Sequence, residues 1–208
     1  PGHGKNKINA AYSFGGSSLA VETLESLLDV RMDHAAVIDF EGFLGLSEEV
    51  GGVTLKNKIA SKADGFTFPK GEITLKGDEL LSYVRQRHGL PGGDLDRAER
   101  HRAVIKALVL KLLRPETLAN PATFNKVASR IGGYFTVDDE LTNEAIFGLA
   151  TSLKLEGGGS IRSLQAPISG FGRSPLGASI DIVDFEKLDE LATAMREDDM
   201  AAFWERSH

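Results

Sequence analysis

The stretch HAAVIDFEGFLGLSEEVGGVTLKNK, residues 34–58, already indicates the architecture of the chain. Residues 34–40 form a short apolar run bounded by charges, which predicts a buried strand. Residues 41–50 are predicted to be a helix, and the Gly51-Gly52 pair supplies the left-handed residue that commonly ends one. Residues 52–58 alternate between apolar and polar side chains, as a half-buried strand does. A strand, a helix and a strand in succession favour an α/β layered fold.

The flanking segments continue this alternation. We predict a loop over residues 1–18 and an amphipathic helix over 19–29, with Ser18 as its N-cap. Hairpin-like turns are expected within 66–75. Later helices are predicted over 78–83, 121–132, 142–153 and 184–195, and a long helix that follows the charged segment is predicted to end at Leu113. Asp184 is the expected N-cap of the last helix. Short strands and loops are expected in 153–183.

Length and composition limit the classes of protein to consider. The 208 residues suffice for one large domain or a tight pair, and 41% are hydrophobic, which excludes a disordered or fibrous chain. The formal net charge of −6 argues against a general nucleic-acid binder, which needs a broad basic surface. The absence of cysteine excludes disulfides and thiolate chemistry. No apolar run approaches the length of a membrane span, and because the chain begins at Pro1 we expect it to be a piece of a longer protein.

The densest charged segment is RQRHGLPGGDLDRAERHR, residues 85–102. It holds five of the twelve arginines and only three carboxylates, so it is locally positive within an acidic chain. If residues 82–87 are extended, alternate side chains share a face, which would place Arg85 and Arg87 together with Tyr83. The sequence therefore concentrates guanidinium groups at one place along the chain.

The helix that follows brings two more arginines into line with its apolar face. Val104, Leu108 and Leu112 define the predicted buried stripe. Counting back by three and four residues leads to Arg97, Arg100 and His101. A helix N-terminus is already partly positive, so cations there are unfavourable unless an anion is present. Because helix N–H groups and arginine forks both bind phosphate oxygens, the pattern indicates an anion site.

The alternative is that these arginines only pair within the protein. Asp94, Asp96 and Glu99 are near enough in sequence to pair with Arg97 and Arg100, and either aspartate is a suitable helix N-cap. The residues alone leave both interpretations open.

Other candidate positions favour structural roles. Asp39 would be a buried carboxylate if its strand continued, but at the strand end it would cap the next helix, and we favour that interpretation. The segment GKNKINAAYSFGG, residues 4–16, lacks the Gly-Lys-Ser or Gly-Lys-Thr of a P-loop and on its own predicts a surface loop. The histidines lack the paired spacing of a metal site.

Residues 80–88, LLSYVRQRH, followed by Gly93-Asp94-x-x-Arg97-x-x-Arg100, resemble the LytR–CpsA–Psr family of cell-wall proteins. The resemblance extends, in the same order, to KINAAYSFGG (7–16), VIDFEGF (37–43), GGVTL (51–55) and the run ending at Asp78. We therefore predict a family domain over residues 1–150, with 151–208 as an extension that completes or packs on it. One departure is His101, where the family tends to have glutamine.

The resemblance implies an α/β/α layered sandwich with a central mixed sheet and a hydrophobic tunnel for a lipid. It also implies an extracytoplasmic phosphotransferase, held by one N-terminal membrane helix, that moves an anionic glycopolymer from a polyprenyl-pyrophosphate carrier to peptidoglycan. The polymer would be teichoic acid, arabinogalactan or capsule. By motif, the residues that contact the pyrophosphate would be Lys7, Arg85, Arg87, Arg97 and Arg100.

Further roles follow from the same resemblance. Arg87, Asp94 and Arg97 would form the catalytic group, with Asp94 orienting an arginine or assisting proton transfer from the acceptor hydroxyl. Mg²⁺ is implied as a cofactor, with its carboxylate ligands expected mainly in a segment upstream of Pro1. The alternative function is a non-catalytic module that binds polyprenyl-phosphate lipid or an anionic wall polymer.

Overall fold

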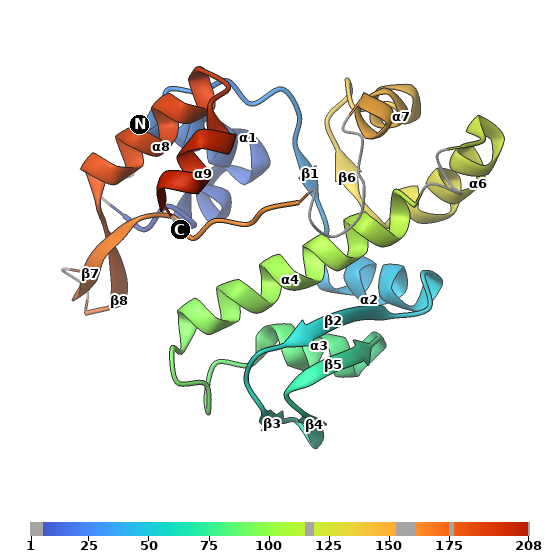
Figure 1. The fold of residues 1–208 in the computed structure, drawn as a ribbon, viewed down its shortest axis with the longest axis horizontal. Helices are drawn as coiled ribbons and strands as arrows, with labels where there is room; N and C mark the ends of the chain where they lie inside the picture. The colour runs from blue at the N-terminus through green and yellow to red at the C-terminus, as the bar shows by residue number, and fades with distance from the viewer. Residues whose placement is uncertain (1–5, 115–118, 153–160, 175–176, 208) are drawn as a thin grey trace. The chain divides into compact units, whose positions relative to one another are not determined.

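The computed structural model describes residues 6–114, 119–152, 161–174 and 177–207, and it consists of helices and short strands (Figure 1). The mixed α/β class is confirmed. Two compact units are present, one formed by residues 36–163 and the other by both ends of the chain, 1–35 and 164–208. These units are compact bodies and not family domains. The predicted family boundary at residue 150 therefore stays a prediction.

The core of the unit 36–163 is built on nested antiparallel strands. The strands are β2 (Val53–Asn57), β3 (Ser61–Ala63), β4 (Phe66–Phe68) and β5 (Gly71–Leu75). β3 and β4 form a tight hairpin, and β2 and β5 pair around it with Val53 opposite Leu75. The strand expected at 52–58 is confirmed. The hairpin-like turn expected within 66–75 is wrong. Residues 69–70 only connect β4 to β5, which do not pair with each other, and the hairpin turn lies at residues 64–65, between β3 and β4.

The central mixed sheet is not formed by the described part of the chain, where every sheet consists of two antiparallel strands. Short connections explain this pairing, because parallel strands need a crossover of roughly a dozen residues or more. Only a few residues separate β2 from β3 and β4 from β5. Local strand pairing therefore replaces the expected mixed sheet in this region.

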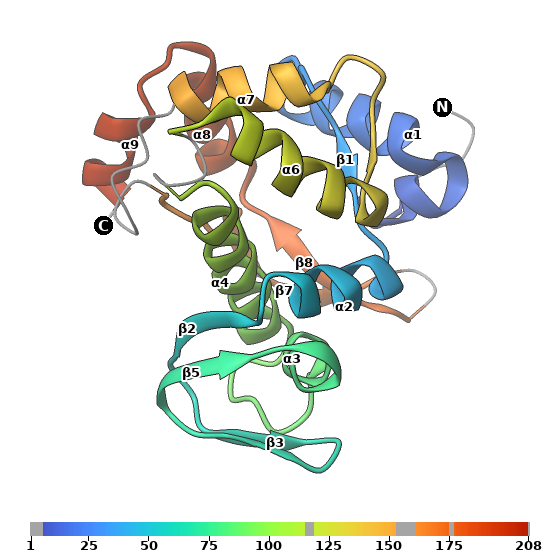
Figure 2. The same ribbon diagram turned by 90° about the vertical axis from the view of Figure 1, so that its right-hand side faces the viewer.

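Three helices share a hydrophobic core with the β2–β5 pair, namely α2 (Phe40–Glu49), α3 (Gly77–Arg85) and α4 (Asp94–Leu112). β2 lies along α4, and the β3–β4 hairpin extends from the β2–β5 pair in both views (Figure 1 and Figure 2). The predicted stripe on α4 is confirmed at Val104 and Leu108, which are buried, and Leu112 is half-buried. The shared core consists of Leu46, Val53, Leu55, Phe68, Ile73, Leu75, Leu80, Tyr83, Val84, Val104 and Leu108.

Asp39 has the structural role that we favoured. Its Oδ1 accepts a hydrogen bond from the Gly42 N–H at 2.7 Å, which starts α2 at Phe40. Because the cap ends the extended segment, the predicted strand 34–40 shrinks to β1 (Ala36–Val37), which pairs with β6 (Thr136–Val137). Neither β1 residue is buried, so the prediction of a buried strand is wrong.

The remaining elements of this unit follow the sequence patterns. α6 (Pro121–Ile131) begins at Asn120, whose side chain caps the helix through the Ala122 N–H at 2.8 Å. A short 3₁₀ turn, η1 (Gly132–Tyr134), follows, and then α7 (Asn143–Ser152). Both helices expected here are confirmed.

The second unit contains α1 (Ala10–Leu28), the hairpin of β7 (Ile168–Arg173) and β8 (Ser179–Val183), α8 (Phe185–Arg196) and α9 (Met200–Ser207). Asp184 caps α8 as predicted. Residues 10–14 are helical, so the expected loop is wrong there. Gly15 and Gly16 are not helical, with a φ of 64° at Gly16, and they separate this turn from the helix that ends at Leu28, which confirms the helix predicted over 19–29. None of the helices in the described ranges is long and apolar enough to span a membrane.

Candidate anion-binding site

The segment that leads into the charged turn is helical. α3 runs to Arg85 with Gln86 as its C-cap, so the extended conformation considered for residues 82–87 is wrong. The cause is the spacing of Leu80, Tyr83 and Val84, which all become buried when the segment is a helix. Arg85 and Arg87 therefore do not share the face of a strand, and Arg87 belongs to the turn.

The turn after α3 ends at a glycine cap. Gly93 is the N-cap of α4 and has a φ of 53°, a conformation that glycine adopts without strain. The expectation that Asp94 or Asp96 would be the cap residue is wrong. The Asp96 carboxylate instead accepts a hydrogen bond from the Gly92 N–H at 2.6 Å, which closes the turn.

Asp94 lies between two arginines at the start of α4. Its Oδ1 accepts a hydrogen bond from Arg87 Nε at 2.8 Å, and its Oδ2 accepts one from Arg87 Nη2 at 3.3 Å. Arg97 Nη2 lies 3.4 Å from the same Oδ1. The three side chains are partly exposed, at 55% for Arg87, 47% for Asp94 and 32% for Arg97. The structure therefore brings together the three residues predicted as the catalytic group, and we call them the Arg87–Asp94–Arg97 cluster.

The cluster carries donors suited to a second anion. The pairing with Asp94 uses two of the five N–H donors of the Arg87 guanidinium, in a two-point geometry that orients the plane of the fork. Two guanidiniums share one carboxylate, so the cluster keeps a net positive charge. The N–H groups of the first turn of α4 add a further partial positive charge.

Arg100 lies on the buried stripe of α4, as predicted, and is only 4% exposed. Its guanidinium stacks on Tyr83 with Cζ 4.1 Å from the ring centroid. It donates to four oxygens without formal charge, Tyr83 O (3.2 Å), Gln86 Oε1 (2.8 Å), Ile59 O (3.5 Å) and Ser61 Oγ (2.7 Å). These contacts favour the internal alternative for Arg100, with neutral oxygens in place of the expected carboxylates. Its contact with pyrophosphate stays a prediction.

Burial shifts the pKa of both members of the stacked pair. Loss of solvent lowers the pKa of Arg100, while the nearby Tyr83 and Asp96 oppose that shift. Burial likewise raises the pKa of Tyr83, which the positive charge of Arg100 partly offsets. Tyr83 Oη also donates to Asn57 Oδ1 at 3.1 Å, so polar contacts continue inward from Arg100 to β2.

The other predicted contact residues are exposed. The Arg85 guanidinium lies over the Phe40 ring, 4.9 Å from its centroid, in a cation–π contact that joins α3 to α2. Lys7 is exposed and belongs to the other compact unit, so the structure does not relate it to the arginines. His101 has its Nε2 2.6 Å from the carbonyl oxygen of Val84, a contact between α4 and α3.

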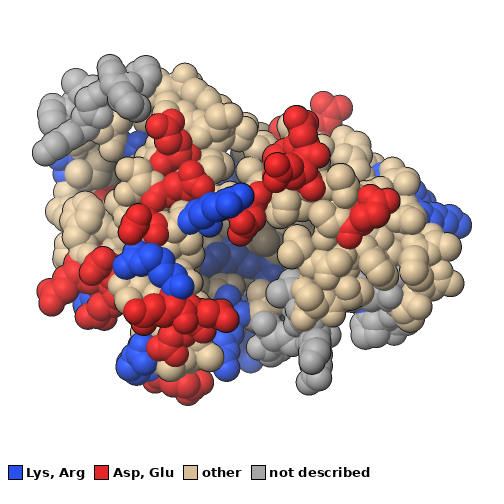
Figure 3. Space-filling model, turned by 90° about the horizontal axis from the view of Figure 1, so that it is seen from above, with Lys and Arg blue, Asp and Glu red and all other residues tan. Residues whose placement is uncertain are grey.

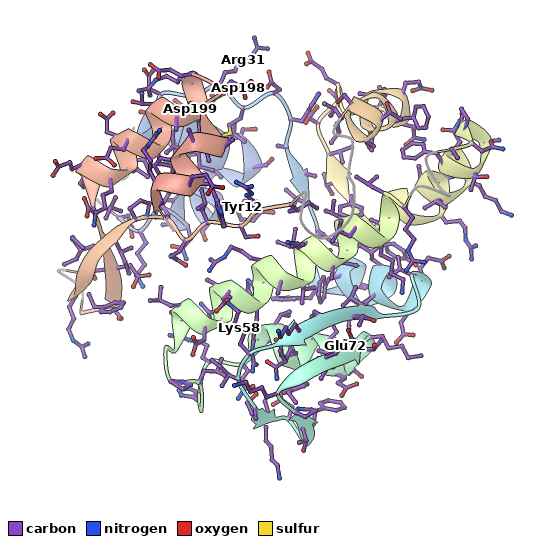
Figure 4. The ribbon with its side chains drawn as sticks, in the orientation of Figure 1. Tyr12, Arg31, Lys58, Glu72, Asp198 and Asp199 are labelled. Carbon is purple, nitrogen blue, oxygen red and sulfur yellow. The ribbon has the colours of Figure 1, made fainter. Side chains whose placement is uncertain are left out.

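The surface of the protein carries charged side chains of both signs. Figure 3 shows lysine and arginine next to aspartate and glutamate on the face drawn there, without one broad basic surface. Lys58, labelled in Figure 4, pairs with Glu99 of α4 beside a depression of about 50 Å³ that Arg100 and Tyr83 help to line. The lipid tunnel implied by the resemblance stays a prediction.

Sequence reasoning missed the buried amide of Gln86. Its position between two arginines gives no sign of burial, and its partners come from segments distant in sequence.

No group of three or more histidine, cysteine, aspartate or glutamate residues in the described ranges is arranged to hold a metal ion. Mg²⁺ binding therefore stays a prediction, with its carboxylate ligands expected mainly upstream of Pro1.

The fold and the site define a mixed α/β domain with an exposed cluster of arginines around one carboxylate. The chain belongs to the LytR_cpsA_psr family, whose model matches residues 1–197, which confirms the resemblance seen in the sequence. The match continues beyond residue 150 into α8.

Two curated relatives illustrate the family. The chain is 41% identical over 121 residues to a polyisoprenyl-teichoic acid–peptidoglycan teichoic acid transferase, TagU, of Enterococcus faecalis, covering 58% of this chain and 40% of that protein. It is 33% identical over 171 residues to the cell wall biosynthesis protein LcpA of Corynebacterium glutamicum, covering 81% of this chain and 32% of LcpA. The chain therefore spans less than half the length of these two relatives.

Solved structures of the family resemble this one. Bacillus subtilis TagV matches with a TM-score of 0.79 and 27% identity over 95% of this chain and 77% of its own. A structure of TagT bound to LIIa-WTA matches with a TM-score of 0.71 and 27% identity, over 95% of this chain and 73% of TagT. These similarities confirm the fold class.

Proposed function

We propose that this chain is the transferase part of an enzyme that moves an anionic glycopolymer from a polyprenyl-pyrophosphate carrier to peptidoglycan. The observation that carries the proposal is the Arg87–Asp94–Arg97 cluster, which presents two arginine forks at an exposed helix start. The names of relatives support the class of reaction, since TagU is called a teichoic acid transferase and TagT is described with LIIa-WTA bound. The cell-wall role of LcpA supports a site outside the membrane.

The chemistry of the cluster fits phosphoryl transfer. Such transfer depends mainly on holding the groups in position and neutralising charge on the phosphate oxygens. Arg87 and Arg97 would bind those oxygens in two-point fashion, while Asp94 keeps the guanidiniums oriented before the substrate arrives. Asp94 is also the candidate to accept the proton of the attacking hydroxyl. Arg85 and Lys7 would add positive charge along the pyrophosphate.

The cofactor and location belong to the same proposal. Mg²⁺ would shield phosphate charge when bound, with ligands outside the residues described here. The lipid carrier places the reaction at a membrane surface, and the acceptor places it on the wall side. Both statements rest on the family relationship and not on a contact in this structure.

The experiment is a binding and turnover assay on the 208-residue chain. Geranylgeranyl pyrophosphate is the lipid probe, with geranylgeraniol and inorganic pyrophosphate as controls, each with and without Mg²⁺. We expect the pyrophosphate lipid to bind more tightly than either control. The turnover arm uses geranylgeranyl pyrophosphate that carries a sugar on its distal phosphate. Transfer of the sugar phosphate to a hydroxyl of a peptidoglycan fragment, with release of geranylgeranyl phosphate, would establish the enzyme. Binding without transfer would favour the non-catalytic module, and no preference for the pyrophosphate lipid would contradict both.

A further inference from the structure

The side chain of Gln86 is buried beside the arginine-bearing turn, with 6% of its surface exposed. Its Nε2 donates to the carbonyl oxygens of Lys62 at 3.2 Å and His88 at 2.9 Å. Its Oε1 accepts from Ser61 Oγ at 2.9 Å and from Arg100 Nη1 at 2.8 Å. An amide side chain offers two donor hydrogens and two acceptor lone pairs, so all four positions are used.

These four bonds fix the backbone on both sides of Arg87. Gln86 is held to β3 and to α4, and the carbonyl of His88 is held to Gln86, so both neighbours of Arg87 in the chain are fixed. Arg87 itself is exposed and has its two-point contact with Asp94, the first residue of α4. A shift of residues 86–88 would therefore move Arg87 relative to Asp94 without removing either side chain.

We propose that Gln86 is a positioning residue for Arg87, acting through the backbone of the turn and without touching substrate. The proposal rests on the proposed function and adds to it a specific source of preorganisation. Misplacing a binding group by about 1 Å can cost on the order of 100-fold in rate. Gln86, which fixes the turn, is therefore expected to have a large effect on activity.

The test compares Gln86→Met with Ser82→Ala, a matched control. Ser82 is also buried on α3, but its hydroxyl donates to Ala63 O and Asp64 Oδ2 in the β3–β4 hairpin and has no link to the turn. Each variant is measured for melting temperature and for geranylgeranyl pyrophosphate affinity well below melting. We expect both to melt earlier, and only Gln86→Met to bind about tenfold or more weakly. Equal affinity of the two variants would overturn the proposal.

A second variant covers the case in which Gln86→Met does not fold. Gln86→Glu keeps an oxygen toward Arg100 and Ser61, but it sets a carboxylate oxygen against the carbonyl of His88. The exposed His88→Glu controls for the added negative charge. We expect Gln86→Glu to remain folded and to bind more weakly than His88→Glu. Equal affinities of these two variants would overturn the positioning role.

A direct spectroscopic measurement separates this proposal from the proposed function. The Nε–H of Arg87 is hydrogen-bonded to Asp94, so in the unaltered chain it should exchange with water more slowly than the Nε–H of an arginine without such a bond. We expect faster exchange in the Gln86 variants and no change in Ser82→Ala. If the unaltered chain does not bind the pyrophosphate lipid, the proposed function is wrong. If the exchange rate of the Arg87 Nε–H is the same in the Gln86 variants as in the unaltered chain, the positioning role is wrong.

Discussion

Replacing Arg87 with alanine should weaken binding of geranylgeranyl pyrophosphate by about 100-fold, because a charge-assisted two-point contact is lost. The free energy of unfolding should change little, since the ion pair with Asp94 is exposed and such pairs contribute roughly 0–1 kcal/mol. Calorimetric titration gives the affinity, and urea unfolding gives the stability.

A matched control for this variant exists in the same compact unit. Arg130 pairs with Glu49 at 2.6 Å and its side chain is 62% exposed, so Arg130→Ala removes a comparable ion pair away from the turn. It should leave affinity unchanged. Arg87→Lys should fall between wild type and alanine, because lysine keeps the charge but not the fork. An Arg87→Ala protein that binds like Arg130→Ala would rule out Arg87 as a pyrophosphate contact.

Replacing Arg100 with methionine should lower the free energy of unfolding by about 2–4 kcal/mol, because methionine keeps some bulk but leaves buried acceptors without their donor. Gln86 Oε1 and the carbonyl of Tyr83 would each lose a hydrogen bond, and the stacking on Tyr83 would disappear. Urea unfolding, followed by circular dichroism, measures the change.

The comparison variant is Arg97→Met on the more exposed part of the same helix, which should unfold close to wild type. The pair of variants also separates the two roles considered for Arg100. Loss of stability in Arg100→Met establishes the structural role. Unchanged stability together with lost pyrophosphate binding would instead make Arg100 a ligand contact, as the family resemblance implies.

Features set by local sequence were predictable. The stripe on α4 and the caps at Asp39 and Asp184 depend on residues three or four apart, and the structure has all of them. The contact between Arg87, Asp94 and Arg97 could also be predicted, because the three residues lie within eleven consecutive positions and belong to a motif of a known family.

Features that depend on distant contacts were not predictable. The segment 82–87 contains residues compatible with a strand or a helix, and the burial of Tyr83 against Phe68 decided in favour of the helix. Gln86 is buried only because Ser61 and Lys62 of β3 lie beside it. In α1 the two glycines have non-helical backbone dihedrals, so they separate the helical turn of residues 10–14, which the sequence pattern did not predict, from the predicted helix that follows.

The nested pairing of β2 to β5 has a consequence for the order of folding. The inner β3–β4 hairpin closes a short loop, and its closure brings β2 beside β5 at a small further cost in chain entropy. Such local contacts favour rapid formation. α4 can then dock its Val104 and Leu108 face on a scaffold that already exists. Arg100 reaches Ser61 and Gln86 only when α4 docks, so the buried polar contacts behind the arginine turn form after the strands have paired.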